Sequence, residues 1–225
     1  MSILNLPDSD KIARHFRRAL RECVRSDKPF LHWNLTEVLP DELCLHIIGL
    51  PIAPLVIDDC RGVRDVDNSL RTFLTPHIQS RHPVLARFAE ALQQPDVAEL
   101  CGRTCGFDVE GSYLRMEYIQ DIDGAWLKPH CDVPEKLCSM VIYLCTGPDA
   151  EDWGTDIYDE QQHVIGRTSA EFNTAAIFVP GKNTWHGFEK RPIAGIRRLF
   201  EVNYVHPSWR DKDQVCFPDR PVRLG

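Results

Sequence analysis

A histidine and an aspartate lie two residues apart at His130 and Asp132, and a second histidine, His186, follows Asp132 by 54 residues. Two imidazoles and one carboxylate on the same side of a metal make a facial triad, which holds iron(II) and leaves coordination positions open. In an extended segment, residues i and i+2 project to the same side, so His130 and Asp132 can chelate one metal from a single strand end. The third ligand then has to come from a later strand that returns beside the first.

These three residues also have an ordinary explanation. The chain contains nine histidines, and His-x-Asp pairs arise by chance. A single histidine after a tryptophan, as in Trp185-His186, is often a packed surface residue. An interaction domain in which the three residues are incidental is therefore the non-enzymatic alternative. Their occurrence together in one β-rich half of the chain favours the metal site.

The C-terminal half has the pattern of a sheet protein. Residues 113–119 alternate with the period of a strand, and five later runs have similar strand character: 139–145, 154–158, 163–165, 174–179 and 197–205. These runs are separated by turn signals and not by helical patterns. Such spacing indicates an antiparallel sandwich or barrel, which can bring His186 beside His130 and Asp132.

The N-terminal half has a different, mixed pattern. Helices are predicted over 9–23, 40–48, 83–92 and 95–100, with a strand over 30–35 and a turn-rich loop over 52–82. No linker separates the two halves, so we predict a single domain over 1–225. Within it we expect a helical and mixed support region over 1–106, a β core over 107–210 and a C-terminal tail over 211–225.

The ordered set of motifs from Tyr118 to Tyr204 resembles the core of the iron(II)/2-oxoglutarate dioxygenase superfamily, nearest to its prolyl-4-hydroxylase-like branch. The matching elements, in order, are Tyr118, Gly124, His130-Cys131-Asp132, Tyr143-Leu144, Trp153-Gly154-Thr155, His186 and Gly195-Ile196-Arg197. The resemblance covers roughly the last half of the chain. It implies a mainly β (α+β) fold, a double-stranded β-helix of the jelly-roll or cupin-like kind, with supporting N-terminal helices.

The resemblance also implies the cofactors and the residues that hold them. Iron(II) is expected on His130, Asp132 and His186 as catalytic metal ligands, with 2-oxoglutarate and O2 as co-substrates. The distal carboxylate of 2-oxoglutarate needs a cation, and the planar fork of arginine suits it. Arg197 lies 11 positions after His186 and is preferred over Arg198. Tyr143 and Tyr118 are expected to assist at the same carboxylate.

The reaction implied by this resemblance is hydroxylation of a substrate, coupled to conversion of 2-oxoglutarate and O2 into succinate and CO2. Halogenases of the superfamily have a small residue where this chain has Asp132, so hydroxylation or desaturation is favoured over halogenation. A cupin-like metal-binding protein or isomerase is the alternative. It predicts additional histidine or glutamate ligands and requires no arginine at the start of the last strand.

The composition of the chain limits the classes of binding partner that we expect. The net charge of −7 disfavours nucleic acid, whose binding depends on lysine and arginine contacts to phosphate. Nine irregularly spaced cysteines fit a reduced compartment, and no apolar run or secretory signal indicates a membrane or export, so a cytoplasmic location is expected. The expected substrate is a small molecule or a peptidyl side chain, and the sequence predicts no oligomeric state. Candidate substrate contacts near the metal motif are Arg115, Glu117, Asp121, Asp123, Trp126 and Lys128.

Overall fold

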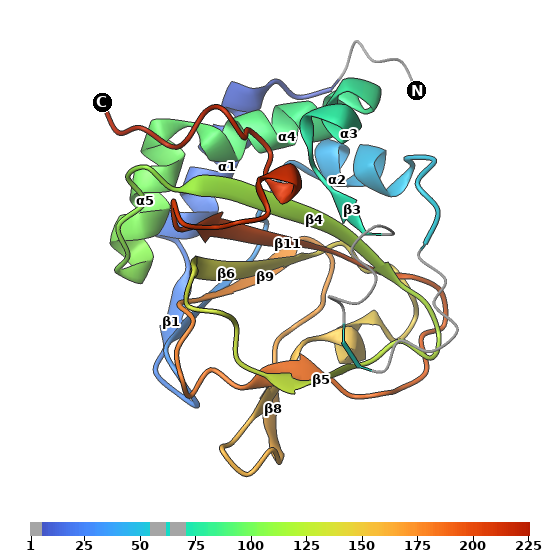
Figure 1. The fold of residues 1–225 in the computed structure, drawn as a ribbon. Helices are drawn as coiled ribbons and strands as arrows, with labels where there is room; N and C mark the ends of the chain where they lie inside the picture. The colour runs from blue at the N-terminus through green and yellow to red at the C-terminus, as the bar shows by residue number, and fades with distance from the viewer. Residues whose placement is uncertain (1–5, 55–61, 64–70) are drawn as a thin grey trace.

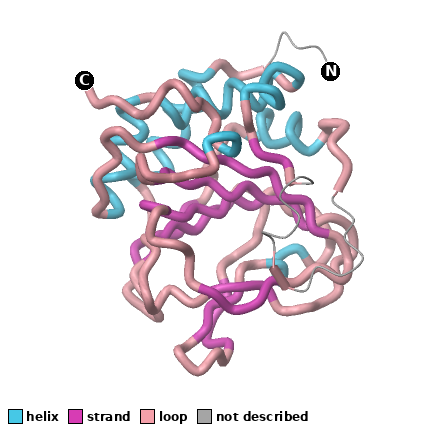
Figure 2. Tube along the Cα trace, viewed as in Figure 1, coloured by secondary structure: helices cyan, strands magenta, loops and turns pink. Residues whose placement is uncertain are grey.

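The computed structural model describes residues 6–54, 62–63 and 71–225, which form two antiparallel sheets and a layer of helices (Figures 1 and 2). The larger sheet has seven strands and the smaller has four. The helices gather on the face of the larger sheet that points away from the smaller one (Figure 1). This is the predicted mainly β fold with supporting helices.

The larger sheet is built around two long paired strands, β4 and β11. In sheet order its strands are β1 (Val24–Ser26), β2 (His32–Leu35), β9 (Thr174–Phe178), β6 (Lys136–Tyr143), β11 (Arg197–Val205), β4 (Tyr113–Asp121) and β3 (Thr72–Phe73). β11 pairs with β4 along its whole length and with β6 on its other side. The helical and mixed support region predicted over 1–106 therefore supplies strands at both edges of this sheet, and the strand predicted over 30–35 overlaps β2.

Alternation along β11 separates the two sides of the larger sheet. Phe200 and Val202 are fully buried among the helices, whereas Leu199 is buried in a second apolar cluster with Phe188, on the side of the smaller sheet. Because side chains alternate with a period of two, one residue of register decides which layer a side chain enters.

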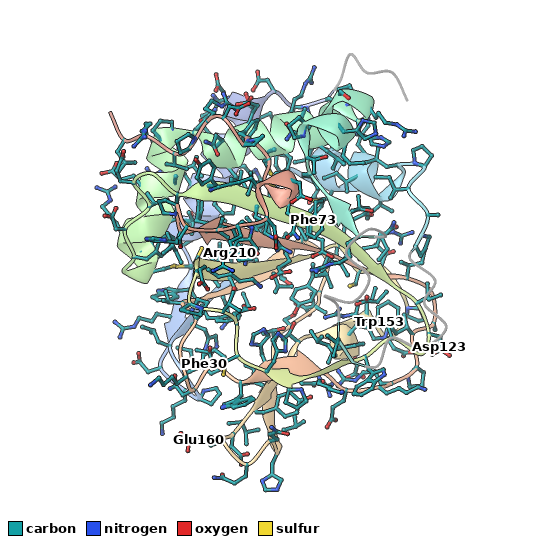
Figure 3. The ribbon with its side chains drawn as sticks, viewed as in Figure 1. Phe30, Phe73, Asp123, Trp153, Glu160 and Arg210 are labelled. Carbon is teal, nitrogen blue, oxygen red and sulfur yellow. The ribbon has the colours of Figure 1, made fainter. Side chains whose placement is uncertain are left out.

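The smaller sheet is short and carries two of the predicted ligands. Its strands, in order, are β5 (Leu127–His130), β10 (His186–Phe188), β7 (Asp156–Tyr158) and β8 (Val164–Arg167), and the 3₁₀ helix η3 (Ala150–Trp153) precedes β7. β7 and β8 form a hairpin, and Glu160 lies near its tip (Figure 3). β10, a strand of only three residues, was not predicted from the sequence.

The helical layer follows the apolar spacing of the sequence. Its helices are α1 (Ser9–Arg21), α2 (Asp41–Ile48), α3 (Pro76–Arg81), α4 (Pro83–Gln93) and α5 (Pro95–Cys105), and the 3₁₀ helix η4 (Lys212–Gln214) lies near the C-terminus. Asp8 caps α1 by accepting a hydrogen bond from the Lys11 backbone N–H at 2.7 Å. Ile12, Phe16 and Leu20 of α1 are buried in the core above the larger sheet.

The loop predicted over 52–82 needs correction where the structure describes it. Residues 72–73 form the edge strand β3, and Thr75 caps the short helix α3 through its side chain. The rest of that prediction, over 55–61 and 64–70, lies outside the described residues. Among the helices that the structure describes, none has the length and apolar character needed to cross a bilayer.

Candidate metal centre

The two predicted histidine ligands lie opposite each other on neighbouring strands. His130 of β5 and His186 of β10 are partners in the antiparallel register, and their ring centroids are 4.3 Å apart. Directly opposed residues of an antiparallel pair have side chains on one face. Strand pairing thus brings together two residues that are 56 positions apart in sequence.

Both imidazoles are oriented in the same way. The Nδ1 atom of His130 lies 2.9 Å from the Lys128 carbonyl oxygen, and that of His186 lies 2.9 Å from the Thr184 carbonyl oxygen. A carbonyl only accepts, so each Nδ1–H donates and each Nε2 keeps a lone pair. This arrangement is typical of histidines that bind a metal through Nε2.

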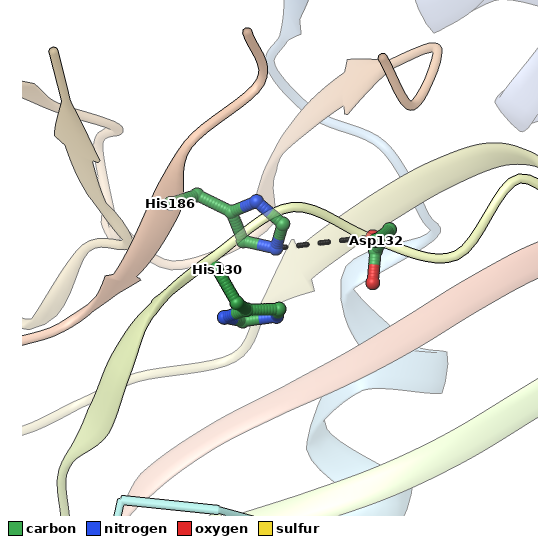
Figure 4. A group of neighbouring side chains, drawn as sticks. All are labelled: His130, Asp132 and His186. Atoms are coloured by element: carbon green, nitrogen blue, oxygen red, sulfur yellow. Dashed lines mark ion pairs between the residues drawn. The ribbon is translucent and has the colours of Figure 1, made fainter. Parts of the chain in front are cut away.

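Asp132 completes the group. One ligand atom from each of His130, Asp132 and His186 can be chosen so that all lie within 4.8 Å of one another (Figure 4). The Nε2 atom of His186 is 3.8 Å from Oδ2 of Asp132. Two nitrogens and one carboxylate oxygen converging from one side are the donor set of a facial triad, so the residues fit an iron(II) ion.

The protonation states also suit a metal. Burial lowers the pKa of His186 to about 4, although Asp132 partly opposes the shift. Burial acts to raise the pKa of Asp132, but the charge of Lys136, the neighbouring His186 and the hydrogen bond from Lys136 together hold that pKa below its ordinary value. At neutral pH the imidazole of His186 is therefore neutral and Asp132 is ionised, the forms that bind a divalent ion.

Close approach of β5 and β10 depends on Gly187. A Cβ atom at this position would lie 2.7 Å from the Leu127 carbonyl oxygen and 3.0 Å from that of Lys128. Both are backbone atoms of β5, so an added side chain has to push the strands apart. The spacing of the two histidines therefore rests on the absence of a side chain between them.

The Gly187→Ala variant is expected to bind a divalent metal at least about tenfold more weakly, because ligand orientation controls affinity on this scale. Strain at the strand pair should also lower stability by about 1–3 kcal/mol. Titration with Co(II) and thermal unfolding of the metal-free protein measure the two effects. Gly166→Ala is the matched control, since a Cβ there meets nothing within 4 Å. Wild-type affinity in Gly187→Ala would contradict this role.

A cavity of about 960 Å³ opens beside the triad. Its wall includes His130, Asp132 and His186 together with Arg197, and its apolar lining includes Ile119, Leu127, Val141, Phe188 and Leu199. The volume lies at the upper end of the range of small-molecule sites. The metal centre thus faces a space large enough for a co-substrate and part of a substrate.

Arg197 lies on the cavity side of β11, as preferred from the sequence. Its Nε donates to the Trp153 carbonyl oxygen at 2.6 Å, and its Nη1 donates to Asp121 Oδ2 at 2.6 Å. Its Nη2 has no hydrogen-bond partner among the described residues. Arg198 points to the opposite face because adjacent strand residues alternate, and it lies near Tyr118.

Tyr143 lies beside Arg197, but its hydroxyl is already engaged. The guanidinium carbon of Arg197 is 5.8 Å from the centre of the Tyr143 ring. The Tyr143 hydroxyl accepts from the Thr155 backbone N–H at 2.9 Å and lies 2.7 Å from both the Thr155 and the Thr168 side-chain oxygens. Thr168 was not predicted as a site residue, and Thr155 was predicted only as part of a turn motif. Of these three, Thr155 lines the cavity.

Tyr118 is not brought to the site. Its ring is buried on the helical side of β4, stacked on Phe200 at a centroid distance of 4.8 Å. The cavity side of β4 is occupied by Arg115 and Ile119, which differ from Tyr118 by an odd number of residues. The expectation that Tyr118 contacts a co-substrate is therefore wrong. Side chains alternate along β4 with a period of two, and this places Tyr118 on the side of the helices.

Lys136 and Ser139, which were not predicted as site residues, both contact Asp132. Lys136 Nζ donates to Oδ1 at 2.6 Å, and the Ser139 hydroxyl lies 2.5 Å from Oδ2. Lys136 is four positions after Asp132, a spacing with no special meaning in an irregular segment. The two side chains reach the Asp132 carboxylate because a turn leads from Asp132 into β6, and this could not be predicted from their spacing in the sequence.

Neither a family model nor a curated protein matches this sequence, but solved structures match its fold. A Pseudomonas putida prolyl-4-hydroxylase aligns with 91% of this chain and 99% of its own, with a TM-score of 0.53 and 14% identity. A Phytophthora capsici prolyl 4-hydroxylase aligns over 88% and 65%, with a TM-score of 0.58 and 10% identity. EctD from S. alaskensis aligns over 86% and 82%, with a TM-score of 0.55 and 15% identity. The chain therefore shares its fold, a double-stranded β-helix with supporting helices, with these solved structures.

Proposed function

We propose that this protein is an iron(II)- and 2-oxoglutarate-dependent oxygenase that hydroxylates an organic substrate. The observation that carries the proposal is the convergence of His130, Asp132 and His186 on a cavity that also contains Arg197. A cupin-like metal protein without oxidative chemistry has no need of a buried cation at that position. When bound, iron(II) and 2-oxoglutarate supply the oxidising chemistry, in which O2 is consumed and succinate and CO2 are formed.

In this proposal the chain's own residues have separate tasks. His130, Asp132 and His186 hold the metal from one side. Arg197 binds the distal carboxylate of 2-oxoglutarate through the part of its guanidinium that Trp153 and Asp121 leave open. Tyr143 packs beside Arg197 and supports the end of the cavity where Arg197 lies. The apolar residues that line the cavity exclude water. The carboxylate of Asp132 occupies a metal position, which favours hydroxylation over halogenation.

Net charge and cavity size support the substrate class that we propose. A cavity of about 960 Å³ accepts a small molecule or a peptidyl side chain. The net charge of −7 argues against nucleic acid as the partner. We propose a small-molecule or peptidyl substrate and a cytoplasmic location.

The test is anaerobic addition of iron(II) and 2-oxoglutarate to the metal-free protein. The proposal expects a weak visible absorption band from charge transfer between the metal and the bound 2-oxoglutarate. On admission of O2 with candidate substrates, succinate should form in a one-to-one ratio with hydroxylated product. Absence of the band, together with no succinate from any candidate, would overturn the assignment.

A further inference from the structure

Both oxygens of Asp132 are held by side chains from strand β6. Lys136 Nζ donates a hydrogen bond to Oδ1 at 2.6 Å, and the Ser139 hydroxyl donates one to Oδ2 at 2.5 Å. The oxygen bound by Ser139 is also the one nearer to His186, at 3.8 Å from its Nε2. Groups that contact a metal ligand from outside set its orientation and its donor strength.

The Ser139 hydroxyl is part of a chain with a defined direction. Arg115 Nη1 donates to Asn203 Oδ1 at 2.8 Å. The amide nitrogen of Asn203 donates to the Ser139 oxygen at 3.2 Å and to the Cys138 carbonyl oxygen at 3.3 Å. A guanidinium can only donate and a carbonyl can only accept, so the amide of Asn203 has one possible orientation. The Ser139 hydroxyl receives one hydrogen bond and must donate its own hydrogen to Asp132.

Strand register builds this chain. Asn203 in β11 is the direct partner of Arg115 in β4 on one side and of Ser139 in β6 on the other. The three side chains therefore form a row across the sheet, on the face that looks into the cavity. Arg115 and Ser139 also line that cavity.

A second, charged connection ends on the same carboxylate. Lys136 Nζ lies 2.5 Å from Glu201 Oε1, while Glu201 Oε2 is 3.5 Å from Arg115 Nη1. Arg115 is thus linked to both oxygens of Asp132, by one neutral route and one charged route. Its own side chain is only 3% exposed, and its Nε donates to Gln214 at 3.0 Å.

The guanidinium of Arg115 is already bonded to neighbouring side chains, which argues against its expected role as a substrate contact. Its guanidinium is engaged by Gln214, Asn203 and Glu201, and it lies 3.6 Å from Glu117. A cation whose donors face the protein's own acceptors gains little from an additional ligand. Such a group stabilises an arrangement of neighbours.

We propose that Arg115, Asn203 and Ser139 form a directed hydrogen-bond chain that positions Asp132 as a metal ligand. This inference rests on the proposed metal centre. In it Ser139 and Asn203 are positioning residues, since neither is a ligand itself. Their effect is to hold Oδ2 of Asp132 toward the side where His130 and His186 converge.

The Asn203→Asp variant tests the direction of the chain. The substituted carboxylate still accepts from Arg115 and has nearly the same shape, but it cannot donate to Ser139. The Ser139 hydroxyl is then drawn away from Asp132. The proposal expects the dissociation constant for Co(II) to rise about tenfold or more. Simple electrostatics expects the opposite, because an added negative charge attracts a cation.

The Ser139→Ala variant tests the same link without any change of charge. Its Co(II) dissociation constant should rise by roughly 10–100-fold, measured by ligand-field absorption without 2-oxoglutarate. Ser112→Ala is the matched control, because Ser112 is also a buried serine and its hydroxyl has no partner among the described residues. Ser112→Ala should bind Co(II) as wild type does. Circular dichroism of the metal-free variants checks that each is folded.

The outcomes separate this inference from the proposed function. If wild type binds Co(II), His130→Ala does not, and both Ser139→Ala and Asn203→Asp bind weakly, the chain is supported. If His130→Ala loses binding but Ser139→Ala keeps wild-type affinity, the chain is overturned while the metal centre stands. Tighter binding by Asn203→Asp would also overturn it. If wild type and His130→Ala bind Co(II) equally, the metal centre and the chain both fail.

Discussion

The Asp132→Ala variant is expected to lose both metal binding and turnover. Its side chain supplies the only carboxylate of the group formed with His130 and His186 in the described part of the chain. Loss of a group outside the ligands costs roughly 10–100-fold in metal affinity, so loss of a ligand should cost more. Two neutral imidazoles alone leave a divalent ion with no compensating negative charge. His130→Ala and His186→Ala should behave in the same way.

Measurement of this effect needs a readout that does not depend on the substrate. Calorimetric titration with a divalent metal and the visible band formed with iron(II) and 2-oxoglutarate both serve. His163→Ala is a suitable control, since His163 lies in the β7–β8 turn and its imidazole contacts Asp159. Retention of the band in Asp132→Ala would mean that the carboxylate is not a ligand.

The Arg197→Ala variant is expected to require about 10–100-fold more 2-oxoglutarate for half-maximal activity. A charge-assisted hydrogen bond to a carboxylate contributes roughly 1.5–3 kcal/mol, and each 1.4 kcal/mol corresponds to about tenfold. Arg198→Ala should leave that requirement unchanged, because its side chain points to the helical side of β11. The measurement is the dependence of succinate formation on 2-oxoglutarate concentration at saturating iron(II).

The Arg197→Ala change also removes the ion pair between Arg197 and Asp121, so a stability control is needed. Arg197→Lys keeps the charge near Asp121 but lacks the planar fork, and it should give an intermediate requirement. Comparison of thermal unfolding for the three variants separates a general loss of fold from a loss of co-substrate binding. A raised requirement in Arg198→Ala, with none in Arg197→Ala, would move the anchor to Arg198.

Local patterns were sufficient for most of the regular structure. Alternation over 113–119 predicted β4, strand character over 197–205 predicted β11, and helical spacing over 9–23 predicted α1. Each of these signals is contained within one segment. By contrast, β10 spans three residues and β3 spans two, which is too short for any period to register. Such strands exist because a neighbouring strand pairs with them.

The sequence by itself determined which kind of metal site this chain is predicted to form. The tertiary structure decided which other residues lie at that site. The types and order of His130, Asp132 and His186 predicted a metal-binding triad, since two imidazoles and one carboxylate suit iron(II). Pairing between distant strands placed Tyr118 away from the cavity and brought Ser139 onto Asp132. A single strand's pattern records that its side chains alternate. The side that faces the cavity is fixed only by register with strands far away in the chain.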